Sequence, residues 1–179
     1  VEGARYYSDL SLWDTFRTEH PWLTLVYPEY QRDFVRSIVL MGEALGYFPR
    51  WPLGPGETSG MLGDCGALMV ADTWLRGLRD FNVERAWTIA RRSAFMAPPM
   101  SRREGMDDYM RLNYVPIEAD GNGASVTLEY AYADGALAAM ARALGHTADA
   151  EALARRATSY RNIYDPAQRF LVGRRRDGS

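Results

Sequence analysis

Hydrophobic residues recur with helical spacing in six segments of this chain, and the segments are of different kinds. Three are apolar on one side only: residues 28–46, 83–96 and 147–160. Two are apolar on nearly every side: residues 61–78 and 124–144. A helix that is apolar all round needs neighbours on all sides, whereas a one-sided helix lies at the surface. The remaining segment, residues 12–27, contains Pro21, which must either kink a helix or lie in its first turn after a break.

The two kinds of segment alternate, which predicts helical hairpins with one inner and one outer member. We therefore expect an all-α fold, a partial (α/α)6 toroid of about three αα-hairpins, formed as a single region over residues 1–179. The turn at 165–166 leads into a short extended segment near the C-terminus, residues 170–173. An α-solenoid would use the same hairpins, but the unequal loops and the lack of a repeated residue pattern disfavour it.

Two long connections separate the helical segments. Residues 48–63 are rich in Pro and Gly, and residues 97–123 carry several acids, including Asp107 and Asp108. Connections of this length are usually functional or disordered. The acids could attract calcium, but they lack a fixed ligand spacing, so we interpret them as surface turns.

The most distinctive stretch is residues 11–21, SLWDTFRTEHP, which places an indole, a carboxylate and a guanidinium within about one helical turn. A sugar ring can pack its C–H bonds on an indole while its hydroxyls bind charged groups, so Trp13 and Asp14 suit carbohydrate. Alternatively, Ser11 and Asp14 form a capping box and Trp13 is simply buried. The residues alone leave both explanations open.

Composition narrows the class of protein. Hydrophobic residues make up 47% of the chain and charged residues 25%, as in globular domains. A net charge of -2 disfavours binding to nucleic acid or to an anionic membrane. Cys65 is the only cysteine, which excludes an intrachain disulfide, and no apolar run is long enough to span a membrane. Because the chain starts at Val1 and ends in a turn-like run, we expect a piece of a longer protein.

Several ordered blocks resemble one known family. Residues 6–21, YYSDLSLWDTFRTEHP, resemble the opening of the catalytic toroid in glycoside hydrolase family 92, which are calcium-dependent exo-α-mannosidases that invert anomeric configuration. Further blocks resemble the family in the same order: Arg50–Leu53, Gly56–Thr58, Leu128–Tyr132 and Phe170–Gly178. The chain departs from the family's usual residues at Gly56, where Asn is expected, and at Ala133-Asp134, where two acids are expected. Residues 97–114 are also longer than expected.

The resemblance implies a function for the full-length protein and a role in substrate binding for these residues. The full-length protein would be secreted or periplasmic, would bind mannose-containing glycans and would need calcium. The family's acid, base and calcium loop lie C-terminal to these residues, so we assign no catalytic residue and no metal ligand here. We also expect the chain alone to be inactive and to supply one wall of the sugar pocket. The substrate-binding candidates are Trp13, Asp14, Arg50, Trp51, Glu57 and Glu129.

Other assignments stay open on the residues themselves. Glu57 and Glu129 could be the acid–base pair of an inverting glycosidase, whose carboxyl groups stand about 6.5–9.5 Å apart. Alternatively, Glu57 caps a helix and Glu129 pairs with Arg50. We interpret His20 as a hydrogen-bonded packing residue and Cys65 as an inert core thiol. A trehalase-like hydrolase, a sugar epimerase and a non-catalytic helical-hairpin binding module are the alternative functions.

Overall fold

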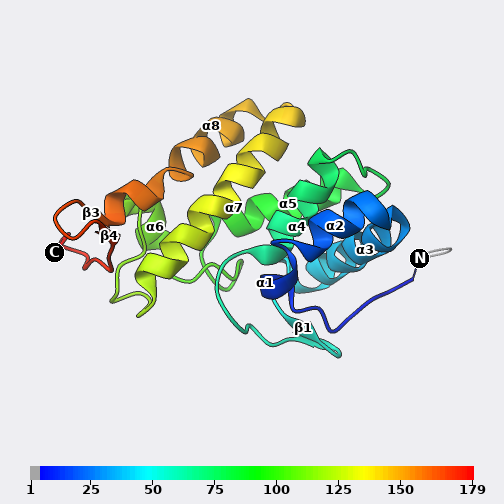
Figure 1. The fold of residues 1–179 in the computed structure, drawn as a ribbon, viewed down its shortest axis with the longest axis horizontal. Helices are drawn as coiled ribbons and strands as arrows, with labels where there is room; N and C mark the ends of the chain where they lie inside the picture. The colour runs from blue at the N-terminus through cyan, green and yellow to red at the C-terminus, as the bar shows by residue number, and fades with distance from the viewer. Residues whose placement is uncertain (1–4) are drawn as a thin grey trace.

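A computed structural model of the chain describes residues 5–179 (Figure 1). The α-helices of this range are α1 (Leu12–Thr15), α2 (Glu19–Val26), α3 (Pro28–Leu45), α4 (Cys65–Leu75), α5 (Val83–Phe95), α6 (Met106–Leu112), α7 (Gly123–Ala143) and α8 (Thr147–Arg156), followed by the 3-10 helix η1 (Ser159–Ile163). Two antiparallel strand pairs complete it: β1 (Pro52–Leu53) with β2 (Gly56–Glu57), and β3 (Tyr164–Asp165) with β4 (Phe170–Leu171). No helix within residues 5–179 is both long and apolar enough to cross a bilayer.

The helices form hairpins with inner and outer members, which confirms the predicted all-α partial toroid. The inner helices are α4, which is buried along most of its length, and α7, which runs through the middle of the molecule beside α8 (Figure 1). Helix α4 contacts α1, α2, α3, α5 and α7. Helices α3, α5 and α8 each bury one face and leave the other in water. This arrangement brings the first part of the chain against α7.

The structure differs from the prediction where elements are short. The first helical segment breaks after Thr15 and resumes at Glu19, so Pro21 lies in the first turn of α2, where its missing N–H leaves no bond unmade. Helix α6 lies inside the connection expected at residues 97–123. It is bounded by Gly105 and Asn113, both in the left-handed conformation. The loop at residues 48–63 contains the β1–β2 hairpin.

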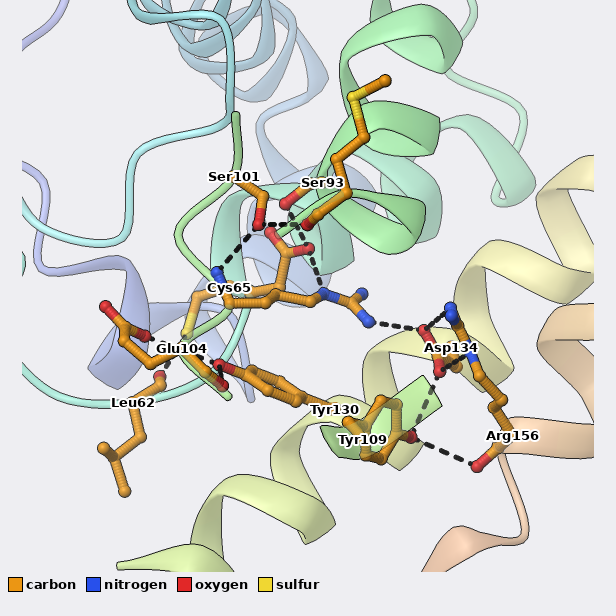
Figure 2. A network of polar contacts seen from close by, with 12 residues as sticks. Leu62, Cys65, Ser93, Ser101, Glu104, Tyr109, Tyr130, Asp134 and Arg156 are labelled. Carbon is orange, nitrogen blue, oxygen red and sulfur yellow. Dashed lines mark hydrogen bonds and ion pairs between the residues drawn. The ribbon is translucent and has the colours of Figure 1, made fainter. Parts of the chain in front are cut away.

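A group of buried charges joins the helices beneath the main core (Figure 2). The fully buried Arg103 donates from Nε to Asp64 Oδ2 at 2.9 Å and from Nη1 to Asp134 Oδ1 at 2.6 Å. Arg156 donates to both oxygens of Asp134, at 2.9 and 3.1 Å. We call these four residues, Asp64, Arg103, Asp134 and Arg156, the buried charge quartet. It links the start of α4, the loop before α6, the middle of α7 and the end of α8.

The two negative and two positive charges of the quartet balance, and two hydroxyl groups add hydrogen bonds to its carboxylates, while Arg103 Nη2 has no partner in the described part of the chain. Ser93 Oγ donates to Asp64 at 2.9 Å, and the Tyr109 hydroxyl lies 3.2 Å from Asp134 Oδ2. Burial alone would lower the pKa of Arg103, but the carboxylates of Asp134 and Asp64 outweigh it and raise that pKa. Burial, helped by the charge of Asp134, raises the pKa of Tyr109, which therefore stays a neutral hydrogen-bond donor. The two carboxylates thus favour the charged form of Arg103 in spite of its burial.

We predict that Asp134→Ala lowers the free energy of unfolding by about 3–5 kcal/mol, because it leaves two buried guanidinium groups without their shared carboxylate. Urea denaturation measures this loss. Asp149→Ala is the matched control, because Asp149 receives a two-point bond from Arg91 at the surface, at 2.6 and 3.2 Å. Its loss should not exceed about 1 kcal/mol. Equal losses of unfolding free energy in the two variants would show that the quartet stabilises the fold no more than a surface ion pair does.

Candidate functional site

The structure brings the opening motif against α7 through one guanidinium. Arg17 Nη2 donates to Glu129 Oε1 at 3.0 Å across 112 residues of sequence. The Arg17 guanidinium carbon lies 4.9 Å from the ring centre of Trp13 and 4.6 Å from that of Phe16. Phe16 in turn packs against Tyr132 of α7, with ring centres 6.1 Å apart. We call Trp13, Asp14, Arg17 and Glu129 the α1–α7 surface.

Asp14 is the freest carboxylate of this surface. It is exposed in the first turn of α1, and its side chain makes no hydrogen bond or ion pair with residues 5–179. The capping-box alternative is wrong, because the Ser11 side chain does not cap α1; only its carbonyl accepts from the Asp14 and Thr15 amides. Trp13 is half-buried. A carboxylate beside an indole is therefore available for a ligand.

Three of the predicted site residues carry a buried polar atom without a hydrogen-bond partner in the described part of the chain. These atoms are Trp13 Nε1, Glu129 Oε2 and Arg50 Nε. A buried polar atom left unpaired costs about 1–3 kcal/mol, so each such atom calls for a functional or structural reason. The hydroxyl groups of a bound sugar can both donate and accept hydrogen bonds, and could pair with such atoms.

Glu57 is engaged by backbone amides instead. Its carboxylate accepts from the amides of Arg50 at 2.9 Å, Trp51 at 3.1 Å and Ser59 at 2.7 Å. It therefore ties together the open end of the β1–β2 hairpin, and the alternative that it caps a helix is wrong because it lies in β2. On its other side Glu57 lines a groove of about 230 Å³ against Leu40 and neighbouring residues of α3.

Arg50 and Trp51 flank this hairpin. Arg50 is buried, and its one ion-pair partner among residues 5–179 is Glu104, at 3.5 Å from Nη2. The alternative that Glu129 pairs with Arg50 is wrong, because Glu129 pairs with Arg17. Trp51 is half-buried beside Gly60. The hairpin thus contributes one buried cation and one indole.

Cys65, at the start of α4, shows that several of these groups lie close together. Burial is the main cause that raises the pKa of its thiol. The charges of Glu129 and Asp64 raise that pKa further, whereas Arg50 and Arg17 lower it. The charges of Glu129, Arg50 and Arg17 thus all act on one buried thiol. The high pKa confirms that Cys65 is an inert core residue.

Neither histidine chemistry nor a metal cluster adds to this surface. His20 is buried and its Nδ1 lies 2.8 Å from Gln31 Oε1, which confirms a packing role. Burial lowers the pKa of His20, so the neutral ring is favoured. Within residues 5–179 no three His, Cys, Asp or Glu side chains are grouped to hold a metal ion.

Arg17 was not among the predicted site residues. It lies two positions after the end of α1, in the turn that leads to α2. Its ion pair with Glu129 joins segments far apart in sequence and depends on the packing of α1 against the inner helices. Only the structure shows that contact.

Comparisons with known proteins identify the family of this chain. The sequence profile of the glycosyl hydrolase family 92 catalytic domain matches residues 1–179. Two structures from Bacteroides thetaiotaomicron are each 31% identical: the family 92 inverting mannosidase BT2199 of strain VPI-5482, with a TM-score of 0.90, and the family 92 α-mannosidase BT3965, with a TM-score of 0.93. The match covers 98% and 100% of this chain, respectively, and 24% of each of those chains, so the chain spans about a quarter of their length.

Further comparisons add one ligand and one more fold match. BT3965 is also known in complex with mannoimidazole. The family 92 glycosyl hydrolase ccman5 shares the fold at 23% identity and a TM-score of 0.69, over 100% of this chain and 23% of that one. No curated protein matches the sequence.

We predict that Glu57→Ala opens the β1–β2 hairpin. Loss of a charged acceptor that binds three amides should speed hydrogen exchange at the amides of Arg50, Trp51 and Ser59 by about 10–100-fold. Exchange measured by NMR tests this. Glu43→Ala is the control, because Glu43 pairs with the Arg85 side chain. Unchanged exchange at the three amides would contradict the structural role and leave Glu57 free for a ligand.

Proposed function

Because this chain belongs to glycosyl hydrolase family 92, we propose that it is part of an α-mannosidase. The full-length enzyme hydrolyses terminal α-linked mannose from glycans with inversion, and these residues supply one wall of the sugar pocket. Support comes from the mannosidases that the chain resembles and from the complex of BT3965 with mannoimidazole. Export from the cytoplasm and a need for calcium, with calcium ligands outside these residues, belong to the same proposal.

One observation carries this proposal: Arg17 lies over the indole of Trp13, next to Asp14 in sequence, and donates to Glu129 of α7. Two sequence blocks of the family thereby form one surface that has an aromatic face, a free carboxylate and unpaired polar atoms. In the proposed pocket the indole of Trp13 packs against the C–H face of a mannose ring. Asp14 accepts hydrogen bonds from its hydroxyls.

The proposal places the chemical step outside these residues. Inversion needs an acid and a base about 6.5–9.5 Å apart with a water between them. Glu57 accepts hydrogen bonds from three amides and Glu129 accepts one from Arg17, so the protein holds both carboxylates in fixed positions. We therefore assign both to structure and substrate positioning.

The alternative functions differ in their products. A trehalase-like hydrolase would release glucose from trehalose, and an epimerase would release no sugar from a glycoside. Family membership disfavours both, and it also disfavours a non-catalytic binding module. Chromatography of the products from a panel of glycosides distinguishes the three enzymes.

We predict that Asp14→Ala in the full-length protein lowers kcat/KM for an aryl α-mannoside by at least about 100-fold, since hydrogen bonds to an ionised group contribute up to about 3 kcal/mol each and a sugar makes several. Glu84→Ala is the control, because Glu84 is also an exposed acid in the first turn of a helix. Normal turnover by a folded Asp14→Ala enzyme would remove Asp14 from the site.

We also predict that the 179-residue chain alone releases no mannose above the uncatalysed rate, because the acid and base lie elsewhere. A fluorogenic α-mannoside offers a sensitive assay. Mannosidase activity that co-purifies with the chain, and that Asp14→Ala abolishes, would show that the acid and base have been misplaced.

A further inference from the structure

We propose that Arg17 is a positioning residue, which holds the Glu129 carboxylate so that its second oxygen can accept a hydrogen bond from a sugar hydroxyl. This inference rests on the proposed function and deepens it. It starts from an asymmetry: Glu129 Oε1 receives the Arg17 guanidinium at 3.0 Å, whereas Oε2 is buried and has no partner in the described part of the chain.

The Arg17 side is held in place by aromatic rings. Its guanidinium lies over both Trp13 and Phe16, within 4.9 and 4.6 Å of the ring centres. Phe16 is anchored in the core and packs on Tyr132 of α7. Stacking on two rings restricts the rotamers of an otherwise flexible side chain, so the guanidinium presents its fork to Glu129 in a fixed direction.

The Glu129 side is shaped by a glycine. A Cβ at Gly63 would lie 2.9 Å from Glu129 Oε2 and 3.0 Å from Glu129 Cβ, closer than atoms approach without a shift. Gly63 also has a φ of +88°, which other residues adopt only with strain. The lack of a side chain at Gly63 therefore leaves room for this carboxylate beside the loop before α4.

A carboxylate with one buried, unpaired oxygen is costly, and the hydrogen bond from Arg17 to the other oxygen offsets part of that cost. The side-chain ion pair is 43% exposed at Arg17 and 16% exposed at Glu129, so it lies at the boundary with water. A surface pair of this kind adds little to stability. The ion pair instead orients the carboxylate: Arg17 binds one oxygen of Glu129 and leaves the other oxygen for a hydrogen-bond donor of the ligand.

A double-mutant cycle on the full-length enzyme tests this with an aryl α-mannoside. Arg17→Met and Glu129→Gln should each lower kcat/KM by about 10–100-fold, as expected for one charge-assisted hydrogen bond. The double variant should be no worse than Glu129→Gln alone, because Arg17 acts through Glu129. Arg17→Lys, which keeps the charge, should recover part of the activity.

Arg79→Met is the matched control. Arg79 lies over Trp74 at the same 4.9 Å but has no ion-pair partner among residues 5–179, so its loss should leave kcat/KM within about twofold. Losses that multiply in the double variant would overturn the proposal, as would wild-type kcat/KM in Arg17→Met. Thermal melting of each variant confirms that it is folded.

Crystal structures of the same variants give a result that does not depend on turnover. In Arg17→Met the Glu129 carboxylate should leave its place over Gly63, and in Arg79→Met it should stay. A Glu129 side chain unmoved in Arg17→Met would overturn the positioning role. If the wild-type enzyme cleaves no mannoside, the proposed function fails, and these structures still decide whether Arg17 positions Glu129.

Discussion

The buried charge quartet is the constraint on which the rest of this structure depends. Two aspartates and two arginines from four separate segments meet where water cannot reach them, and the sum of their charges is zero. Apolar burial is non-directional, so by itself it specifies the rotation of a helix less sharply than a charged contact does. A buried ion pair resists displacement, because a displaced charge loses both its partner and its solvent. The quartet therefore fixes how α7 lies against α4 and α8.

The orientation of α7 decides where its functional face points. Glu129 precedes Asp134 by five positions, which corresponds to a rotation of about 140° around the helix. When Asp134 is bound in the interior by Arg103 and Arg156, Glu129 is turned towards α1. The α1–α7 surface thus depends on the quartet, because the buried ion pairs of Asp134 set the rotation of α7 and thereby the direction of the Glu129 carboxylate.

The sequence predicted the helices correctly where long segments have a clear helical period of hydrophobic residues. The apolar pattern of residues 124–144 predicted an inner helix, and the one-sided pattern of residues 28–46 predicted an outer one; both are confirmed. Helix α6 and the β1–β2 hairpin were not predicted. A helix of seven residues and two strands of two residues are too short to show a clear period of hydrophobic residues. Their ends are set by tertiary contacts, which no local pattern encodes.

The site was harder to predict than the fold for a physical reason. Trp13 and Asp14 are neighbours in sequence, so their chemistry can be read directly. The roles of Glu57 and Arg17 depend on which atoms reach them: backbone amides in one case, a carboxylate 112 positions away in the other. The residue type shows that a carboxylate can accept hydrogen bonds, but only the packed structure shows which donor groups reach it.

The most direct test of the account is a crystal structure of the full-length protein with a mannose-configured inhibitor. We expect the sugar ring to pack on Trp13, with a hydroxyl within about 2.5–3.2 Å of Asp14 and another at Glu129 Oε2. A sugar ring bound elsewhere, with Trp13 and Asp14 facing only solvent or other protein segments, would contradict the claim that the α1–α7 surface is a wall of the pocket.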